Sequence, residues 1–277
     1  MKQSEEHWEV TGGAGLHASR WEPEGTPRGA VALVHGLGEH SGRYGDLVER
    51  LAGAGYAVVA VDLRGHGRSS GKRGHTLVEE CLGDIDRLLE DAARRCPGAP
   101  VFLYGHSFGG LLVLAHLLRR RPVVAGAVVT GPALHTDLRA QKAKVLLTRV
   151  LGRFLPTVTV PSGVKPELVS RDPAVVAAYR ADPLVHDRVS LGFGRQALAA
   201  IDHTLAHAGE LSVPTLVLHG GADRLTFPSG SQALARQAGG DCTLRILDDL
   251  YHELHHEPER ERIFDEIVAW LDAHRRA

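Results

Sequence analysis

Short apolar runs alternate with longer amphipathic segments along most of the chain. Continuous apolar runs predict buried strands at residues 30–35, 56–62, 101–105, 123–130, 214–219 and 242–247. Apolar residues at helical spacing predict helices at residues 43–54, 76–95, 108–121 and 257–274. Strands and helices that alternate in this way form βαβ units. The predicted fold class is therefore α/β, with a mainly parallel central sheet covered by helices on both faces.

Two segments depart from this alternation. Residues 7–22 have no helix after them, and we expect an antiparallel hairpin at the edge of the sheet. Residues 133–208 contain several prolines but no clear strand pattern, and we expect a helical insertion over the end of the sheet. The expected organisation is a core domain of residues 1–132 and 209–277, with residues 133–208 inserted in it.

The charge balance limits the partners of the protein. Its 277 residues include 32 Lys and Arg and 33 Asp and Glu, which gives a formal net charge of −1. This leaves no global basic field, and we expect no nucleic-acid partner. The N-terminal residues are acidic, and no apolar run of about 18 residues occurs, so we expect neither a signal peptide nor a membrane span.

Cysteine and histidine usage adds two expectations. Cys81, Cys96 and Cys242 are scattered and form no CxxC pair, which favours a reducing compartment and a cytoplasmic location. We expect these cysteines to fill core positions or helix faces. The 17 histidines are expected mostly at polar surface positions.

The pentapeptide GHSFG at residues 105–109 is the strongest chemical signal. It follows a predicted strand and opens a predicted helix, which is the setting of a nucleophile elbow. Such a turn lifts a hydroxyl above the end of the sheet, and small residues flank it because the backbone is crowded there. Ser107 is therefore the candidate nucleophile.

A serine nucleophile needs a base, and the base needs an acid that orients it. On a sheet of this kind the chain order is Ser, then acid, then His, each at the end of a strand. Asp223 and His252 each follow a predicted strand in this order. His255 and His256 lie close behind, but His252 comes first after its strand and is the preferred base.

The negative charge of a tetrahedral intermediate needs two N–H donors. Phe108, directly after the nucleophile, is the first candidate, because the helix N-terminus offers free backbone N–H groups. Leu37 is the second candidate. It lies between two glycines in the loop HGLG at residues 35–38, after an earlier strand, where its N–H can turn inward.

Five phrases give the chain a family likeness. They are HGLGEHSGRY at 35–44, DLRGHGRS at 62–69, GHSFGG at 105–110, GADR at 221–224 and YHELH at 251–255. With them the chain resembles the α/β-hydrolase superfamily and, within it, the branch of monoacylglycerol lipases and lysophospholipases. The resemblance implies Ser107, Asp223 and His252 as the catalytic triad, and Leu37 and Phe108 as the oxyanion hole. It also implies that the insertion is a lid over an acyl-binding tunnel.

The same resemblance places polar residues for the glycerol end of the substrate at Glu39, Arg43, Tyr179 and His255. Glu39 and Arg43 equally suit a structural ion pair in a βα loop, so both interpretations stay open.

The implied reaction is hydrolysis of a small lipid ester, a monoacylglycerol, to glycerol and free fatty acid through an acyl-serine intermediate, with no metal or cofactor. A lysophospholipase or a general carboxylesterase uses the same machinery and stays open as an alternative. The sequence does not define an oligomeric state.

Two patterns suggest other chemistry. Residues 252–256 match the zinc pattern HExxH, which needs both histidines on one helix face. Pro258 disfavours helical geometry before it, so we expect the closing helix to begin at residue 257, after the motif. Residues 36–41 follow a strand as a dinucleotide-binding loop does, but serine replaces the third small residue. Neither pattern explains the elbow at Ser107.

Residues 142–160 combine apolar residues with Lys142, Lys144, Arg149 and Arg153. Two interpretations stay open for this segment. Its apolar stripe packs on the core domain, or part of it stays exposed at the tunnel mouth and makes weak, reversible peripheral contact with a membrane. An acyl chain needs an apolar path, because each CH₂ left in water costs about 0.8 kcal/mol.

Overall fold

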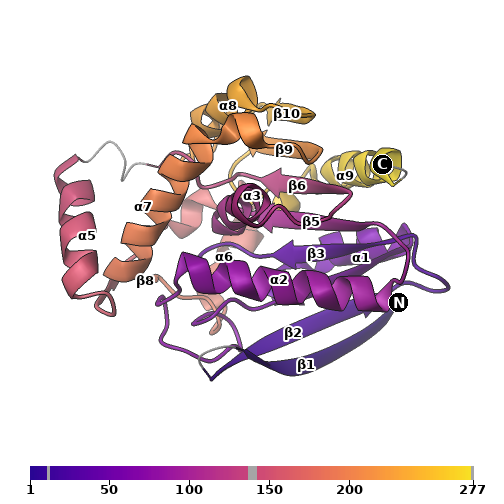
Figure 1. Ribbon diagram of the computed structural model, residues 1–277, viewed down its shortest axis with the longest axis horizontal. Helices are drawn as coiled ribbons and strands as arrows, with labels where there is room; N and C mark the ends of the chain where they lie inside the picture. Colours follow the sequence, from indigo (N-terminus) through magenta and orange to yellow (C-terminus); the bar gives the residue numbers. More distant parts are fainter. Residues whose placement is uncertain (11–12, 137–141, 276–277) are drawn as a thin grey trace.

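The centre of the molecule is a mainly parallel sheet of eight strands. The computed structural model describes residues 1–10, 13–136 and 142–275. The strand order is β1-β2-β4-β3-β5-β6-β9-β10 (Figure 1). The strands are β1 (Lys2–Val10), β2 (Ala14–Glu22), β3 (Gly29–Val34), β4 (Tyr56–Val61), β5 (Val101–His106), β6 (Gly126–Thr130), β9 (Thr215–Gly220) and β10 (Cys242–Leu247).

The pairing of the strands confirms the predicted α/β class. β1 and β2 form an antiparallel hairpin, and β2 pairs antiparallel with β4 at one side of the sheet. The six strands from β4 to β10 in the sheet order pair parallel throughout. The edge hairpin is therefore present as predicted, although it begins at Lys2 rather than at residue 7.

Helices cover both faces of the sheet and divide the core into two layers. Figure 1 shows α2 and α3 in front of the sheet, with α1 and α9 behind it. Apolar side chains of α2 and α3 pack with one face, and those of α1 and α9 pack with the other. The helices are α1 (Gly45–Gly53), α2 (Val78–Arg95), α3 (Phe108–Arg120) and α9 (Arg260–His274). Strands β3, β4 and β9 are buried along their whole length, which explains their unbroken apolar sequences.

Two boundaries and one helix differ from the sequence expectation. β6 begins at Gly126, and Val123 is fully exposed, so the apolar run overstates the strand. The closing helix begins at Arg260 rather than at residue 257, after a 3₁₀ turn at Leu254–His256. Helix α8 (Pro228–Gln237) was not predicted, because its sequence PSGSQALARQ contains a single large apolar residue, Leu234.

The segment between β6 and β9 contains helices but also a small sheet. Its elements are α5 (Lys142–Phe154), α6 (Pro173–Ala181), α7 (Leu191–Ala206), and the antiparallel pair β7 (Thr159–Pro161) and β8 (Arg188–Ser190). The expectation of no strand here is wrong, because three-residue strands are too short to form an alternating pattern. Of the predicted insertion, residues 137–141 lie outside the described residues, as do the side chains of residues 142–144.

The expectation that histidines lie mostly at the surface is also wrong. Eight of the 17 are buried, and His7 alone is classed as exposed. Some of their ring nitrogens have protein partners in place of water, whereas both ring nitrogens of His255 are buried without a hydrogen-bond partner among the described residues. Nε2 of His35 accepts the backbone N–H of Leu63 at 2.8 Å, and Nδ1 of His219 lies 2.7 Å from Oγ of Ser231.

The other two expectations concern cysteines and membrane spans. Cys81 and Cys96 are buried as expected, and Cys242 is partly buried in β10. Within the described ranges, none of the helices combines the length and the hydropathy that crossing a bilayer requires.

Candidate active site

Ser107 occupies the sharp turn between β5 and α3. Its backbone has a φ of 54° and a ψ of −115°, a strained conformation for a residue with a side chain. Glycine is required beside it, because a Cβ atom on Gly105 would overlap Gly109, and a Cβ atom on Gly109 would overlap the carbonyl oxygen of Val34. The local sequence therefore forms the elbow that the motif predicts, at the carboxyl end of a central strand.

The structure brings the three candidate triad side chains together. Nε2 of His252 lies 2.9 Å from Oγ of Ser107, and Nδ1 of His252 lies 2.7 Å from Oδ2 of Asp223. Asp223 follows β9 and His252 follows β10, so all three stand at the carboxyl ends of parallel strands. In this geometry Nδ1 of His252 donates to the carboxylate, which leaves Nε2 free to accept the serine proton.

Backbone and side-chain donors fix the carboxylate of Asp223. Its Oδ1 accepts the N–H groups of Leu225 at 2.8 Å and of Thr226 at 3.0 Å. Its Oδ2 accepts the Thr226 hydroxyl at 2.9 Å, in addition to the His252 ring. The same hydroxyl lies 3.2 Å from Nδ1 of His252. The sequence analysis missed Thr226, and its only signal was its place three residues after the candidate acid.

The electrostatics of this pair suit a general base. Burial lowers the pKa of His252, but the Asp223 carboxylate outweighs it and holds that pKa above its ordinary value. Burial raises the pKa of Asp223, but His252 and the hydrogen bond from His219 hold that pKa well below its ordinary value. Asp223 is therefore ionised when His252 takes up a proton.

The loop that follows β3 lies beside the elbow. Leu37 and Phe108 both line the cavity at Ser107, and the N–H of Phe108, first in α3, has no acceptor within the helix. Glu39 stabilises this loop, because its Oε1 accepts the N–H of Gly36 at 2.7 Å and the hydroxyl of Tyr44 at 2.6 Å. Glu39 is thus a structural acceptor as well as a lining residue.

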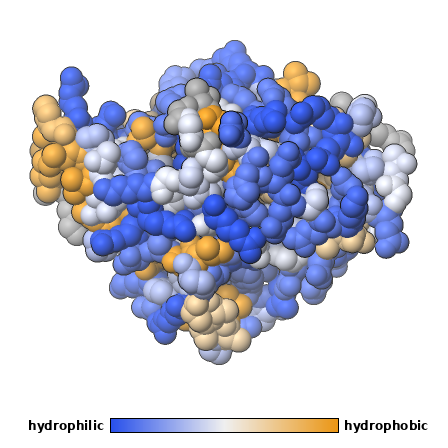
Figure 2. Space-filling model, turned by 90° about the horizontal axis from the view of Figure 1, so that it is seen from below, coloured by the Kyte–Doolittle hydropathy of each residue, from blue (hydrophilic) through white to orange (hydrophobic). Residues whose placement is uncertain are grey.

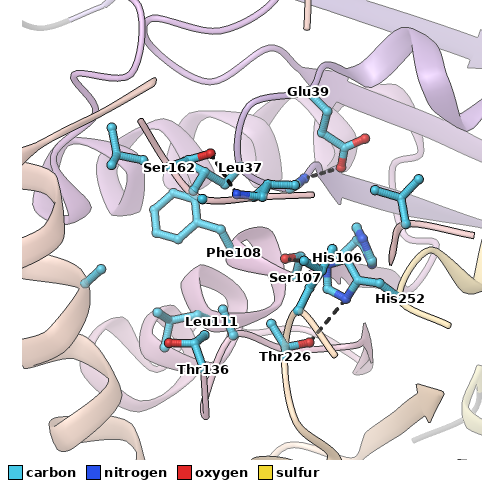
Figure 3. Close-up of a pocket in the computed structure, with 18 of the residues that line it drawn as sticks. Leu37, Glu39, His106, Ser107, Phe108, Leu111, Thr136, Ser162, Thr226 and His252 are labelled. Atoms are coloured by element: carbon cyan, nitrogen blue, oxygen red, sulfur yellow. Dashed lines mark hydrogen bonds between the residues drawn. The ribbon is translucent and has the colours of Figure 1, made fainter. Parts of the chain in front are cut away.

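The cavity beside Ser107 has a volume of about 260 Å³ and two chemically different parts. One part is lined mainly by apolar side chains, among them Phe108, Leu111, Phe193, Leu198 and Ile201. The other part is lined by Glu39, Tyr179 and Glu253. Figure 3 shows Glu39 to one side of Ser107 and His252, with Phe108 and Leu111 toward the other. Such a cavity suits a substrate with an apolar chain and a polar group on either side of a scissile bond.

The four residues expected at the glycerol end separate into two pairs. Glu39 and Tyr179 line the cavity. Arg43 lies behind them, with Nη1 3.0 Å from Oε2 of Glu39 and its guanidinium 4.6 Å from the centre of the Tyr179 ring. His255 is buried against the ring of Tyr44 at 4.4 Å, in parallel stacking, and is not among the described lining residues.

Glu253 is a lining residue that the sequence analysis missed. Its carboxylate binds Arg43 through two hydrogen bonds, from Nη1 at 2.6 Å and from Nη2 at 2.7 Å. Burial raises the pKa of Glu253, but Arg43 outweighs it and holds that pKa well below its ordinary value. Glu253 directly follows His252 in the sequence, but the sequence analysis considered it only as the glutamate of the zinc pattern HExxH.

The geometry does not fit the zinc pattern HExxH. The motif precedes α9 and contains a 3₁₀ turn, so His252 and His256 do not share a helix face. Nε2 of His252 faces Ser107, whereas Nε2 of His256 donates to the carbonyl oxygen of Arg43 at 2.8 Å. Glu253, His255 and His256 have potential ligand atoms within 4.8 Å of one another, but the Arg43 guanidinium already occupies the carboxylate.

The fold and the Ser–His–Asp arrangement together define a serine hydrolase of the α/β-hydrolase class. Comparison with known proteins agrees with this class. Residues 25–259 match the Hydrolase_4 family model, which is described as "Serine aminopeptidase, S33".

Two relatives and one solved structure extend the comparison. The chain is 38% identical to the monoacylglycerol lipase of Mycolicibacterium smegmatis over 98% of both chains. It is 36% identical to the monoglyceride lipase of Homo sapiens over 92% of this chain and 86% of that protein. The crystal structure of the Paleococcus ferrophilus monoacylglycerol lipase superposes with a TM-score of 0.87 at 41% identity, over 94% of this chain and 99% of that one. The protein belongs to the monoacylglycerol lipase branch of this α/β-hydrolase family and is a carboxylic ester hydrolase.

Proposed function

We propose that the protein hydrolyses monoacylglycerols to glycerol and free fatty acid. The observation that carries this proposal is the hydrogen-bonded Ser107 at the junction of an apolar and a polar cavity part. An acyl chain suits the apolar part, and glycerol hydroxyls can donate to the carboxylates of Glu39 and Glu253 in the other. The two relatives and the solved structure above, all described as monoacylglycerol or monoglyceride lipases, support the same substrate.

The mechanism follows from the hydrogen bonds of the triad. Oγ of Ser107 attacks the ester carbonyl carbon while Nε2 of His252 accepts the hydroxyl proton. The N–H groups of Leu37 and Phe108 stabilise the resulting oxyanion. His252 then protonates the glycerol oxygen as the C–O bond breaks, and water hydrolyses the acyl-Ser107 by the same steps. Asp223 keeps the proton of His252 on Nδ1 and stabilises the imidazolium.

Residues 133–208 act as a lid in this proposal. Phe193, Leu198 and Ile201 of α7 supply apolar lining, and Tyr179 of α6 supplies polar lining, so the segment covers Ser107 from both cavity parts. Glu39 and Tyr179 contact the glycerol group directly. Arg43 and His255 act from behind them by orienting Glu39 and by packing against Tyr44.

A substrate panel tests the proposed function. We expect kcat/KM for 1-lauroylglycerol to exceed that for lauroyl lysophosphatidylcholine and trilaurin by at least about tenfold, because only the monoacylglycerol places a short polyol beside the carboxylates. A general carboxylesterase would instead favour a short soluble ester such as p-nitrophenyl butyrate. Turnover of p-nitrophenyl butyrate with no turnover of 1-lauroylglycerol contradicts the proposal.

We further propose that α5 makes weak peripheral contact with a lipid surface. Its exposed apolar side chains are Leu146, Leu147, Val150, Phe154 and, just after the helix, Leu155. Figure 2 shows an apolar patch at the left of the molecule, on the side where α5 lies in Figure 1. A helix that buries such a face in the interface gains free energy in proportion to the apolar area removed from water. The contact is reversible and suits a protein that meets the membrane from the cytoplasm.

Co-sedimentation with liposomes tests this contact. We expect a bound fraction that increases with the content of anionic lipid and falls with salt, because Arg149 and Arg153 of α5 are exposed. Absence of binding to liposomes that contain 1-lauroylglycerol contradicts a membrane role and leaves α5 as a packing element.

A further inference from the structure

Arg43 lies behind the polar part of the cavity and is not one of its described lining residues. The two-point hydrogen bond from Arg43 to Glu253 matches the planar guanidinium to a planar carboxylate, the strongest geometry for this type of ion pair. Both side chains are almost completely buried, with exposed fractions of 8% for Arg43 and 4% for Glu253. Low solvent exposure makes this pair difficult to separate, because each buried charge would lose its two-point partner, with Glu39 left on Arg43 at 3.0 Å and His256 left on Glu253 at 2.8 Å.

The remaining surface of the guanidinium is also covered. Nη1 makes a second hydrogen bond to Glu39, and Nη2 lies 3.4 Å from Nδ1 of His256. One face lies over the ring of Tyr179. As a result, Glu39 and Glu253 are lining residues of the cavity in the described part of the chain, whereas Arg43 is not.

An arginine in a binding site usually presents a positive charge to the ligand. Here the carboxylates of Glu39 and Glu253 line the cavity instead and present negative charge. A substrate that enters the polar part meets carboxylate oxygens, which accept hydrogen bonds from hydroxyl groups but repel anions. Without Glu253, the Nη2 side of Arg43 would lose its carboxylate partner while Nη1 kept Glu39. An unoccupied guanidinium edge of this kind binds phosphate well.

We propose that Glu253 determines specificity by holding Arg43 away from the cavity, so that the site accepts uncharged polyol esters and rejects esters whose alcohol part is an anion such as a phosphate monoester. The inference rests on the proposed function and deepens it. One further charge belongs to the same cavity, because the exposed side chain of Arg224 is also a lining residue. Any test must therefore separate Glu253 from Arg224.

The direct test compares two substrates with the same acyl chain. We expect wild-type kcat/KM for 1-lauroylglycerol to exceed that for 1-lauroylglycerol 3-phosphate by about a hundredfold or more, because like charges placed together cost several kcal/mol. In Glu253→Gln this ratio is expected to fall at least about tenfold, whereas in Glu253→Asp, which keeps the charge, it is expected to stay high. A general loss of loop order would lower kcat/KM for both substrates and leave the ratio unchanged, and that outcome overturns the proposal.

Two matched variants locate the effect. Glu257→Gln replaces another buried carboxylate in the same loop, which pairs with Arg171 at 2.6 Å and is not a described lining residue. We expect it to leave the ratio at the wild-type value. Arg224→Gln removes the exposed cation of the lining and is expected to change the ratio less than about threefold. If Arg224→Gln changes the ratio and Glu253→Gln does not, the proposal is overturned.

A binding measurement on the wild-type enzyme tests the same proposal. Its result does not depend on whether the variants fold or on whether the enzyme hydrolyses monoacylglycerols. The non-hydrolysable ethers 1-O-dodecylglycerol and its 3-phosphate are used as competitive inhibitors of p-nitrophenyl butyrate hydrolysis by the wild-type enzyme. We expect the uncharged ether to inhibit at least about tenfold more strongly. Equal inhibition overturns the proposal. Failure of the proposed function would appear differently, as hydrolysis of p-nitrophenyl butyrate without turnover of 1-lauroylglycerol.

Discussion

Proteins usually expose polar side chains and bury apolar ones, and two regions of this molecule do the opposite in different ways. The first region is the set of loops at the carboxyl ends of the central strands, and the second is helix α5. The strand-end loops bury polar side chains, with Asp223 and His252 only 3% and 5% exposed. Helix α5 exposes apolar side chains, with Leu147 at 56% and Phe154 at 71%. Buried polar groups are costly unless they are hydrogen-bonded, and exposed apolar groups forgo the free energy of burial.

The two regions differ in how the cost is offset. In the strand-end loops, compensation is internal, because the carboxylate of Asp223 accepts donors from Leu225, Thr226 and His252. On α5 the outward apolar side chains have no such partner in the described part of the chain, and the lipid contact proposed above would offset this cost. The comparison teaches that the reacting groups sit in a completed hydrogen-bond network, whereas the apolar face of α5 is left unpartnered within the described part of the chain, as the proposed lipid contact requires.

The largest expected effect is at the nucleophile. Ser107→Ala removes the attacking oxygen, and we expect a loss in kcat on the order of 10⁵-fold or more. The melting temperature should stay within a few degrees of the wild type, because alanine leaves the elbow glycines in place. Burst kinetics with p-nitrophenyl butyrate and mass spectrometry of the acyl-enzyme measure this step. Near-normal turnover by Ser107→Ala would contradict the assignment of Ser107 as the nucleophile.

The next largest effect is at the acid. Asp223→Asn keeps the shape of the side chain but no longer favours the proton on Nδ1 of His252, and we expect a loss of roughly 10³–10⁴-fold in kcat. His252 must be neutral to act as base, so wild-type kcat/KM falls as the pH falls through a pKa above 6.5. In the variant, burial dominates and this acid limb is expected to move to lower pH. A pH–rate profile with an unmoved acid limb contradicts the assignment of Asp223.

A third effect is the response of stability to acid. Burial lowers the pKa values of His66 and His255 well below 6.5 in the folded state. The unfolded chain then binds more protons, so their contribution is complete above pH 6.5 and is lost as the pH falls. We expect the melting temperature to drop by roughly 5–10 °C between pH 7.5 and pH 5. His66→Asn, compared with the surface variant His7→Asn, should reduce this drop, and an unchanged drop in both variants contradicts the explanation.

The smallest expected effect is on α5. Leu147→Asp combined with Phe154→Asp should lower kcat/KM for 1-lauroylglycerol in liposomes by about tenfold and leave p-nitrophenyl butyrate within about twofold. Both side chains are exposed, so the melting temperature should change little. The matched control Leu114→Asp places the same charge in the buried core, away from the described cavity lining, and is expected to unfold the protein. Equal losses on both substrates would show that α5 is only a structural element.

Local sequence determined most of the framework of this protein. Apolar runs flanked by amphipathic segments specify buried parallel strands, because such strands are covered on both faces and tolerate few polar positions. The phrase GHSFG specifies the elbow, because only glycine fits at positions 105 and 109 around the strained Ser107. The order Ser, acid, His along the chain was sufficient to select Asp223 and His252, since the parallel strands that precede them end at the same edge of the sheet.

Tertiary structure alone decided the contacts between segments that are distant in sequence. Arg43 and Glu253 are 210 positions apart, and no local pattern indicates that they form a pair. Most of the buried histidines were misplaced for the same reason, because their burial depends on which distant elements of the fold cover them. The sequence likewise did not determine that the apolar face of α5 points outward. An apolar stripe at helical spacing predicts an amphipathic helix, but it does not specify which surface the apolar face meets. Side-chain chemistry is local, whereas burial and pairing depend on which surfaces the completed fold brings together.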